Sequence, residues 1–231
     1  MRHKIIMFSV LFICISSVTT NGQNIRYDTI RYEKPYYLKK VSKFKSEPVK
    51  TGRVIFLGNS ITEFGNWPNL LNDSTVLNRG IAGDNTFGVL ERLGDIVIRE
   101  PSKLFIEIGI NDVAQNIPAS ITVKNILTIV ERVRSKSPKT KFYVMSALPH
   151  NDKAQKKYPE IFHKDEQVNL LNKKLKQKAR KGKFSYIDFN KELLDVDGKL
   201  DTKYAKSDGL HLNETGYQLL IAFLKTKKYL K

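Results

Sequence analysis

The sequence predicts one α/β domain built on a parallel β-sheet with helices on both faces. Three observations support this prediction. Short apolar runs alternate along the chain with longer stretches of helical periodicity, and glycine, asparagine and aspartate follow the runs where strands would end. The length of 231 residues suits a single domain of this class.

Each expected element has its own pattern. The strand candidates are short apolar runs, which lie at 54–57, 75–78, 104–108, 142–146 and 186–188. The helix candidates carry apolar residues at helical spacing, and they lie at 87–99, 121–135, 165–180 and 214–227. Pro118 and Pro138 bracket the second helix as start and stop signals. Because helices separate successive strands, we expect βαβ units and therefore parallel strands.

Residues 1–22 have the composition of a secretory signal peptide. A basic head at 1–4 precedes an apolar run at 5–18 and a small polar stretch at 19–22. The run is shorter than the roughly 20 apolar residues that a comfortable membrane span needs. The sequence therefore predicts export, to the periplasm or the medium, with no stable membrane insertion after cleavage. An uncleaved membrane anchor is the alternative.

Residues 23–50 form a tyrosine- and lysine-rich extension in front of the domain proper, which is expected at 51–231. The tyrosines of the extension indicate a segment packed on the domain rather than a free tail. The single cysteine, Cys14, lies inside the apolar run of the leader. The mature chain is therefore expected to have no disulfide, no catalytic thiolate and no cysteine zinc site.

The chain is strongly basic, with a formal net charge of +17, of which +15 remains once Arg2 and Lys4 leave with the leader. Basic residues concentrate at 34–50 and at 173–183, and the second cluster has the spacing of the solvated face of an amphipathic helix. No zinc-finger pattern and no aromatic RNA-binding signature accompanies them, so nucleic acid is not an expected partner. Unspecific attraction to an anionic polymer outside the cell fits the charge better.

Four polar loops are expected to meet at one edge of the sheet. They follow strand candidates or precede the last helix, and they read GNS at 58–60, NRGIAGD at 78–84, GIND at 109–112 and DGLH at 208–211. Ligands of such sheets bind outside the carboxyl ends of the strands. A functional site is therefore predicted where these loops converge.

His211 and Asp208 have the spacing of a general base and its partner. An aspartate three residues before a histidine can accept a hydrogen bond from Nδ1–H, which leaves Nε2 free to take a proton from a hydroxyl group. Ser60, directly after the first strand, is the candidate nucleophile that such a base would activate. The alternatives are a helix-capping role for Asp208, or for Asn213 beyond it, and an ordinary turn position for Ser60.

Attack on an ester carbonyl also requires hydrogen-bond donors for the oxygen that becomes negative. Three loops offer one donor each. Ser60 is expected to begin a helix and so to have a free backbone N–H, Gly83 lets its backbone N–H approach closely, and Asn111 has a neutral amide.

The blocks GNSIT, NRGIAGDNT, GIND and DGLH, in this order on alternating elements, resemble the SGNH hydrolase superfamily, also called GDSL-type esterases. Within it, the chain is similar to the bacterial esterases of the platelet-activating-factor acetylhydrolase-like branch. The resemblance extends from about Arg53 to Tyr217. It implies a three-layer α/β/α sandwich with a flavodoxin-like parallel sheet, which the strand candidates make five-stranded.

The resemblance also implies roles for individual residues. Ser60 would be the nucleophile and His211 the base, with Asp208 as its partner. The oxyanion hole would combine Ser60 with Gly83 and Asn111. Neither a cofactor nor a metal is implied.

Other residues near these blocks are candidates for weaker roles. The family has an aspartate where this chain has Asn59, which can keep hydrogen bonds while losing a charge. Asn59 and Trp67 are therefore predicted to contribute to substrate binding, Trp67 by lining the pocket or stacking on a sugar, with core packing as the alternative. Asp84 and Asp112 are expected to brace the donor loops. The irregular stretch at 150–167 is a candidate lid, and His163 within it is a candidate second base.

These features predict an exported serine esterase that removes small acyl groups, acetyl above all, from a small-molecule or glycan ester. Two alternatives stay open. One is a lysophospholipase or thioesterase for longer acyl chains, which would need a deep apolar groove beside Ser60. The other is a catalytically silent carbohydrate-binding protein on the same fold, which the intact set of Ser60, Asp208 and His211 disfavours.

Overall fold

The computed structural model describes residues 34–230. The predicted signal peptide at 1–22 and the first part of the extension therefore lie outside the described residues. Within the described range, no helix combines the length and the apolar character that crossing a membrane would require.

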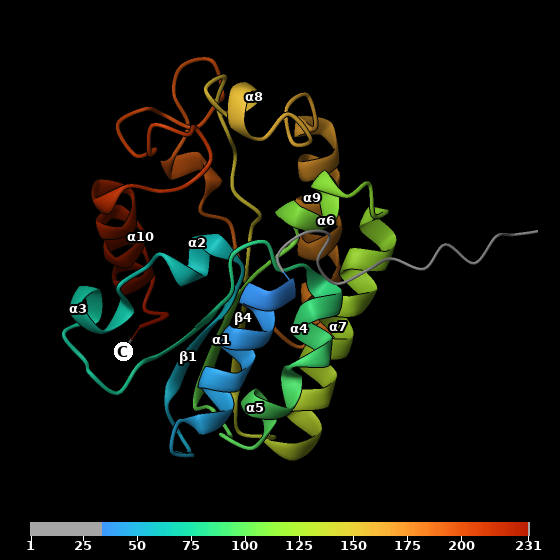
Figure 1. Ribbon diagram of the computed structural model, residues 1–231, viewed down its shortest axis with the longest axis vertical. Helices are drawn as coiled ribbons and strands as arrows, with labels where there is room; N and C mark the ends of the chain where they lie inside the picture. Colours follow the sequence, from blue (N-terminus) through green and yellow to red (C-terminus); the bar gives the residue numbers. More distant parts are fainter. Residues whose placement is uncertain (1–33, 231) are drawn as a thin grey trace, which may run out of the picture.

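The core of the molecule is a five-stranded sheet in which all neighbouring strands run parallel (Figure 1). Its strands are β1 (Val54–Gly58), β2 (Leu77–Gly80), β3 (Lys103–Glu107), β4 (Lys141–Met145) and β5 (Ser185–Ile187). They lie in the order β2-β1-β3-β4-β5, which is the order of flavodoxin-like sheets. The predicted fold class is confirmed.

Helices cover both faces of this sheet, as Figure 1 shows. One face is covered by α4 (Thr86–Glu91), α5 (Leu93–Val97), α7 (Ala119–Lys136) and α9 (Asp165–Gly182). The other is covered by α2 (Ser60–Glu63), α3 (Trp67–Leu71) and α10 (Glu214–Thr226). Alternate residues of a strand point to opposite faces, so Ile55 and Leu57 enter the first core and Phe56 enters the second.

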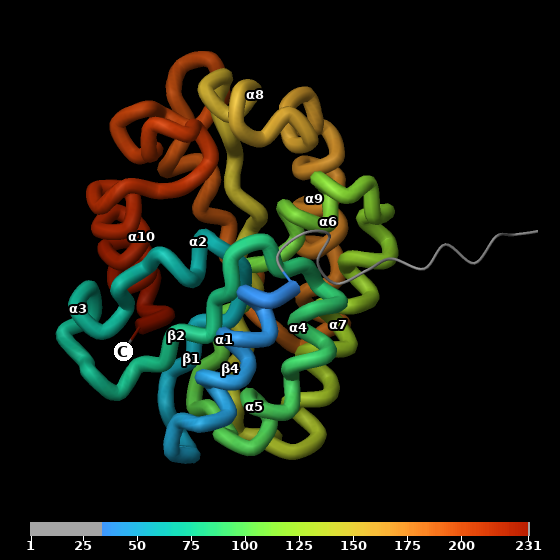
Figure 2. The backbone as a smooth tube through the Cα atoms, in the orientation of Figure 1, coloured from blue at the N-terminus to red at the C-terminus, as the bar shows by residue number. Residues whose placement is uncertain are grey.

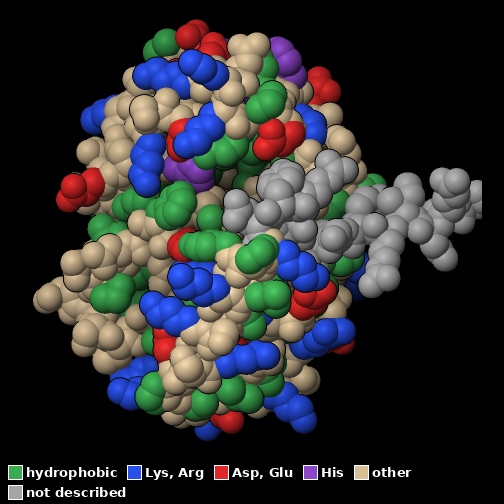
Figure 3. Space-filling model, viewed as in Figure 1, with side chains coloured by type: hydrophobic (Ala, Val, Ile, Leu, Met, Phe, Trp, Pro, Cys, Tyr) green, Lys and Arg blue, Asp and Glu red, His purple; other side chains and the backbone are tan. Residues whose placement is uncertain are grey.

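The remaining short elements lie in the loops. They are α6 (Ile110–Ala114), α8 (Ala154–Lys157) and a 3₁₀ helix at Asn190–Glu192. The basic cluster at 173–183 belongs to α9, which buries Val168, Leu171 and Leu175 and exposes most of its lysines, as the sequence predicts. Lys and Arg side chains are spread over the face shown in Figure 3 rather than gathered into one stripe.

A helix of the extension, α1 (Lys34–Ser46), packs beside β2, the edge strand of the sheet (Figure 2). Its Tyr37 and Phe44 form a small core with Ile81, and the Tyr37 hydroxyl donates to the carbonyl oxygen of Gly88 at 2.7 Å. The Arg79 guanidinium lies 4.6 Å above the centre of the Phe44 ring. These contacts attach α1 to the strand and to the helix that follow the nucleophile loop.

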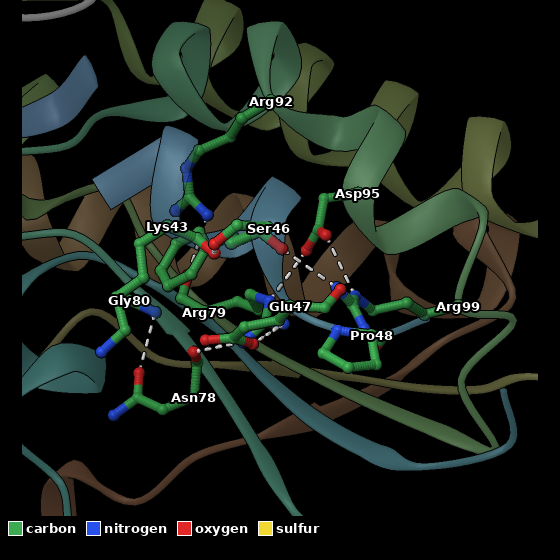
Figure 4. A network of polar contacts seen from close by, with 11 residues as sticks. Lys43, Ser46, Glu47, Pro48, Asn78, Arg79, Gly80, Arg92, Asp95 and Arg99 are labelled. Carbon is green, nitrogen blue, oxygen red and sulfur yellow. Dashed lines mark hydrogen bonds and ion pairs between the residues drawn. The ribbon is translucent and has the colours of Figure 1, made fainter. Parts of the chain in front are cut away.

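A buried ionic network fixes the C-terminal end of α1 to the domain (Figure 4). The Asp95 carboxylate lies between two arginines, at 2.8 Å from Arg79 Nε and 3.0 Å from Arg99 Nε. Arg79 also contacts Glu47 at 2.6 Å, and Arg99 donates to the carbonyl oxygens of residues 44, 47 and 48. Both guanidinium side chains are almost completely buried, at 2% and 1% exposure, so their charges depend on these partners.

Replacing Asp95 with alanine is expected to lower the free energy of unfolding by about 3–5 kcal/mol, because it leaves the buried Arg99 guanidinium without a carboxylate and leaves Arg79 with Glu47 alone. Asp152→Ala is a matched control, since Asp152 pairs with Lys199 at 2.6 Å but both side chains are exposed. Because water screens an exposed ion pair, this pair should contribute little to stability. Urea unfolding of both variants measures the difference, and equal losses would contradict this assignment.

The structure corrects two predicted elements. The second strand begins two residues later than expected, at Leu77, because Thr75 forms a turn in which its N–H and hydroxyl both donate to Asp73. The helix expected at 87–99 is split into α4 and α5 at Arg92. Arg92 leaves the helical conformation there, and its guanidinium donates to Asp84 and to the carbonyl oxygens of Gly58 and Arg79.

Candidate active site

Ser60, His211 and Asp208 form a continuous hydrogen-bonded series at the carboxyl edge of the sheet. The Ser60 Oγ lies 2.8 Å from His211 Nε2, and His211 Nδ1 lies 2.8 Å from Asp208 Oδ2. Ser60 is the first residue of α2, directly after β1, and the other two belong to the loop before α10. The structure thus brings together three residues that the sequence separates by about 150 positions.

The second carboxylate oxygen of Asp208 shapes its own loop. Asp208 Oδ1 accepts the backbone N–H groups of Leu210 at 3.1 Å and His211 at 3.0 Å. Gly209 between them has a φ of +72°, a conformation that residues with a side chain rarely adopt. Asp208 therefore holds the loop with one oxygen and the imidazole ring with the other. Of the two residues considered as caps for the last helix, Asn213 has that role, since its Oδ1 accepts the N–H of Gly216.

Burial and hydrogen bonding set the protonation states of this pair. Burial lowers the pKa of His211 below its ordinary value, against the opposing effect of the Asp208 carboxylate. For Asp208, burial favours the neutral acid, but the hydrogen bonds from His211 and Leu210 outweigh it and hold its pKa below the usual range. At neutral pH the ring is therefore neutral and the carboxylate is charged, which is the state that a histidine base requires.

The three predicted oxyanion donors border the same space as the Ser60 hydroxyl. Within residues 34–230, the backbone N–H groups of Ser60 and Gly83 have no hydrogen-bond partner. Gly83, which lines the pocket, has a φ of +80°, a conformation that residues with a side chain rarely adopt. Asn111 donates one amide hydrogen to the carbonyl oxygen of Asp84 at 2.8 Å, which leaves the other for a ligand.

The loops that carry these donors are braced by two buried aspartates, in agreement with the sequence prediction. Asp84 pairs with Arg92 at 2.8 Å. Asp112 accepts hydrogen bonds from the backbone N–H and the hydroxyl of Thr86, which ties α6 to the start of α4. Burial raises the pKa of Asp112 to about 7. Neither carboxylate lines the pocket in front of Ser60.

A pocket of about 370 Å³ opens in front of the Ser60 hydroxyl. Its lining is mostly apolar, and Figure 3 shows the hollow from outside with hydrophobic side chains at its wall. Besides Ser60, Gly83, Asn111 and His211, the lining residues are Tyr36, Phe64, Ala82, Ala114, Gln115, Tyr158, Glu160, Ile161 and Leu210. Part of the wall comes from the irregular stretch at 150–167, which was predicted as a lid segment.

Helix α1 reaches this pocket through Glu63 of α2. The Tyr36 hydroxyl donates to Glu63 Oε1, and Lys40 Nζ lies 2.9 Å from the same oxygen. Glu63 Oε2 accepts the backbone N–H of Ala82, the residue before Gly83. Tyr36 of the extension therefore lines the pocket, and the Glu63 carboxylate links it by hydrogen bonds to the loop of Gly83.

The structure corrects the predictions for Asn59 and Trp67, because neither side chain reaches the pocket. Asn59 is fully buried and caps α2, with Oδ1 accepting the N–H of Ile61 at 2.8 Å. Trp67 is 2% exposed, stacks on Phe56 with ring centres 3.9 Å apart, and donates its indole N–H to the carbonyl oxygen of Thr62. Both residues thus stabilise α2 and do not line the pocket.

The sequence did not indicate Phe64 as a pocket residue, and it proposed a third residue, besides Asn59 and Trp67, that lies elsewhere. Phe64 and Tyr158 lie beside the imidazole of His211, with ring centres 5.0 Å and 5.6 Å from its own. Tyr158 belongs to the stretch at 150–167 that the sequence offered as a lid candidate, whereas Phe64 has no sequence signal beyond being an aromatic residue in a loop. His163, the candidate second base, does not line the pocket and packs on Phe162 instead.

Glu107 is a buried acid in the core next to α2. It ends β3 and borders a small apolar cavity with Ile61, Thr62 and Trp67. Neither of its carboxylate oxygens has a hydrogen-bond partner within the described chain, and burial raises its pKa to about 8. The side chain is therefore held mainly as the neutral acid at pH 7.

Glu107→Gln is expected to change how stability depends on pH. The folded wild-type protein keeps a proton on Glu107 up to about pH 8, whereas an unfolded chain releases it near pH 4.5. Between these values the wild type loses free energy of unfolding as pH rises, at up to about 1.4 kcal/mol per pH unit. The variant lacks this contribution. Urea unfolding at pH 5, 6.5 and 8 should therefore show its free energy of unfolding rising relative to that of the wild type as pH increases. Parallel pH dependences would contradict the neutral state of Glu107.

The site combines a serine, a neutral histidine and a charged aspartate in one hydrogen-bonded series. Free N–H donors lie beside them at the carboxyl edge of a flavodoxin-like sheet. This is the arrangement of a serine hydrolase. The family model described as the GDSL-like Lipase/Acylhydrolase family matches residues 56–219. The chain belongs to this family, and the protein is a hydrolase of ester bonds. Among residues 34–230, no group of three His, Cys, Asp or Glu side chains could hold a metal ion.

Known proteins with this sequence and fold agree with that assignment. The rat platelet-activating factor acetylhydrolase IB subunit alpha2 is 28% identical over 180 residues, which cover 71% of this chain and 70% of the relative. A GDSL-like lipase from Bacteroides thetaiotaomicron is 26% identical with a TM-score of 0.71, over 84% of this chain and 98% of the other. A structure from Streptococcus pneumonia, provisionally described as a platelet activating factor, is 28% identical with a TM-score of 0.75, over 84% and 92% of the two chains.

Proposed function

We propose that this hydrolase removes small acyl groups, acetyl above all, from an oxygen ester through a covalent acyl-enzyme intermediate. The observation that carries the proposal is the unbroken series from Ser60 Oγ through the His211 ring to Asp208, with both links at 2.8 Å. Such a series activates a hydroxyl that would otherwise be a weak nucleophile.

In the first half of the proposed reaction, Ser60 Oγ attacks the ester carbonyl carbon while His211 Nε2 takes the hydroxyl proton. The carbonyl oxygen becomes negative and accepts hydrogen bonds from the N–H groups of Ser60 and Gly83 and from the Asn111 amide. The tetrahedral intermediate collapses, and the leaving alcohol oxygen receives the proton from His211. A water molecule then attacks the acyl-enzyme with His211 again as the base, which releases the acid and restores Ser60.

Two features support a small acyl group. Residues with small side chains, Ala82 and Ala114, stand beside bulkier Tyr36 and Ile161 in a pocket of about 370 Å³, which must hold the acyl group and the first atoms of the alcohol. The mammalian relatives at 28% identity are named as acetylhydrolases.

We also propose a carbohydrate as the alcohol and export as the route of the protein to it. The export proposal rests on the leader-like composition of residues 1–22. Trp67 is buried, so it is not available for a sugar to stack on. Phe64, which lines the pocket and is 44% exposed, offers an aromatic ring for that purpose and supports the carbohydrate proposal.

A comparison of 4-nitrophenyl acetate with 4-nitrophenyl octanoate tests the acyl preference. We expect kcat/KM to be about 5- to 100-fold higher for the acetyl ester, because methylenes that exceed the room beside Ser60 force side chains apart at about 1–3 kcal/mol. Ser60→Ala supplies the background rate for each ester. A clear preference for octanoyl would contradict the acetyl proposal and favour a lysophospholipase or thioesterase. Glycan binding without turnover above that background would indicate a silent binding protein.

A further inference from the structure

A second pocket of about 550 Å³ adjoins the catalytic pocket. It lies between the α2–α3 segment and the start of α10, and its lining residues are Phe64, Asn66, Asn69, Leu70, Lys206, Leu212, Asn213, Glu214, Tyr217 and Gln218. Phe64 lines both pockets, so the two spaces meet at this ring. The family blocks account for none of the exposed polar side chains in the second pocket.

Phe64 stands between the catalytic base and the second pocket. Its ring centre is 5.0 Å from that of His211, with the planes tilted by 60°, and Lys206 Nζ lies 4.5 Å from the ring centre. His211 is the group that would protonate the leaving oxygen. An alcohol released beside His211 therefore has Phe64 next to it and the second pocket beyond.

The lining of the second pocket has the chemistry of a polyol site rather than of a lipid groove. Asn66 and Asn69 are exposed, and their amides have no hydrogen-bond partner within residues 34–230. Amides both donate and accept, as sugar hydroxyl groups do. The aliphatic side chains are limited to Leu70 and Leu212, and a fatty chain would have to cover unpaired amides at a cost.

We propose that this second pocket binds the alcohol part of the substrate and that this part is a sugar. The proposal rests on the esterase activity proposed above and specifies its substrate class. One apolar face of the sugar ring packs on Phe64, and Asn66 and Asn69 bond its hydroxyl groups. The acyl group then points into the catalytic pocket, and the ester oxygen lies beside His211.

The double variant Asn66→Ala/Asn69→Ala tests the site without touching the catalytic pocket. Asn66 makes no side-chain capping bond to α3, and Asn69 lies on the exposed side of that helix, so both truncations should leave the fold intact. Gln177→Ala, an exposed amide on α9 outside both pockets, is the matched control. The substrates are 4-nitrophenyl acetate and the acetylated forms of cellobiose, xylobiose and chitobiose.

We expect the double variant to lose about 10-fold in kcat/KM on at least one acetylated disaccharide, because two hydrogen bonds of ordinary strength are lost. Its rate on 4-nitrophenyl acetate, which has no sugar, should stay within twofold of wild type, as should both rates of Gln177→Ala. Unchanged rates of the double variant on all three sugar esters would overturn the subsite while leaving the esterase intact.

A binding measurement separates failure of the subsite from failure of the esterase. Calorimetry with Ser60→Ala measures binding of the three unacetylated disaccharides, with and without the two asparagines. Binding that disappears with the asparagines supports the subsite even if no ester is turned over. Absence of binding to every disaccharide, together with unchanged sugar-ester rates, would overturn it.

Discussion

Ser60→Ala is expected to lower kcat for 4-nitrophenyl acetate by about 10⁴- to 10⁶-fold, to the rate of the ester without a working nucleophile. The reason is chemical rather than structural. Without Oγ no acyl-enzyme forms, and His211 Nε2, 2.8 Å from that oxygen in the wild type, has no hydroxyl to deprotonate. The fold should be unaffected, since the side chain makes no other hydrogen bond within residues 34–230.

Two further measurements make this prediction specific. Ser135→Ala is the matched control, because Ser135 is exposed on α7 and bonds only to the carbonyl oxygen of Arg132, so it should keep wild-type activity. A fluorophosphonate probe should label the wild type once per chain, at Ser60, and leave Ser60→Ala unlabelled. Substantial hydrolysis by pure Ser60→Ala would show that another group carries the reaction.

The sequence was sufficient to predict the sheet and the three residues of the hydrogen-bonded series for a definite physical reason. Apolar runs and helical periodicity determine where parallel strands occur, and parallel strands bring their carboxyl ends to one edge. Ser60 lies two residues after the end of β1 and Asn111 lies four residues after the end of β3, so topology places them near each other in space. Asp208 and His211 are close in sequence, and their contact at 2.8 Å is nearly local.

Asn59 and Trp67 show why side-chain direction could not be predicted in the same way. Both flank the nucleophile in sequence, but the first turn of α2 points Asn59 inward to cap the helix. Trp67 lies one short loop further on, where Gly65 leaves room for its ring, and it stacks on Phe56 of β1. Whether a loop aromatic enters a core or a pocket depends on packing between distant segments, which periodicity does not encode.

The contribution of α1 was equally hidden from the sequence. Tyr36 meets Glu63 across 27 positions, and Glu63 reaches Ala82 across a further 19. The family match begins only at residue 56, so no shared motif indicates that α1 borders the pocket. The tyrosine-rich composition predicts only that the extension packs on the domain. Its position beside the loop of Gly83 depends on contacts at the C-terminal end of α1, where Phe44 packs against the Arg79 guanidinium and Arg79 pairs with Asp95.

Asp208→Asn is expected to lower kcat by about 10⁴-fold while leaving the loop in place. The asparagine Oδ1 can still accept the backbone N–H groups of Leu210 and His211, as the aspartate Oδ1 does at 3.1 Å and 3.0 Å. Its Nδ2 then faces His211 Nδ1 and donates to it. The ring proton moves to Nε2, so the nitrogen beside Ser60 becomes a donor and no longer accepts the hydroxyl proton.

The pH profile distinguishes this tautomer effect from simple loss of structure. In the wild type, burial lowers the pKa of His211 below its ordinary value, so the rate should hold as pH falls and decline only below about 6.5. The Asp208 carboxylate opposes that lowering, and its removal should therefore shift the acid limb of the profile to still lower pH. A kcat within tenfold of wild type, with an unshifted acid limb, would mean that Asp208 serves only to hold its loop. Unfolding free energies of the two proteins within about 1 kcal/mol of each other would establish that the lost rate is chemical, because the loop bonds of Oδ1 survive the substitution.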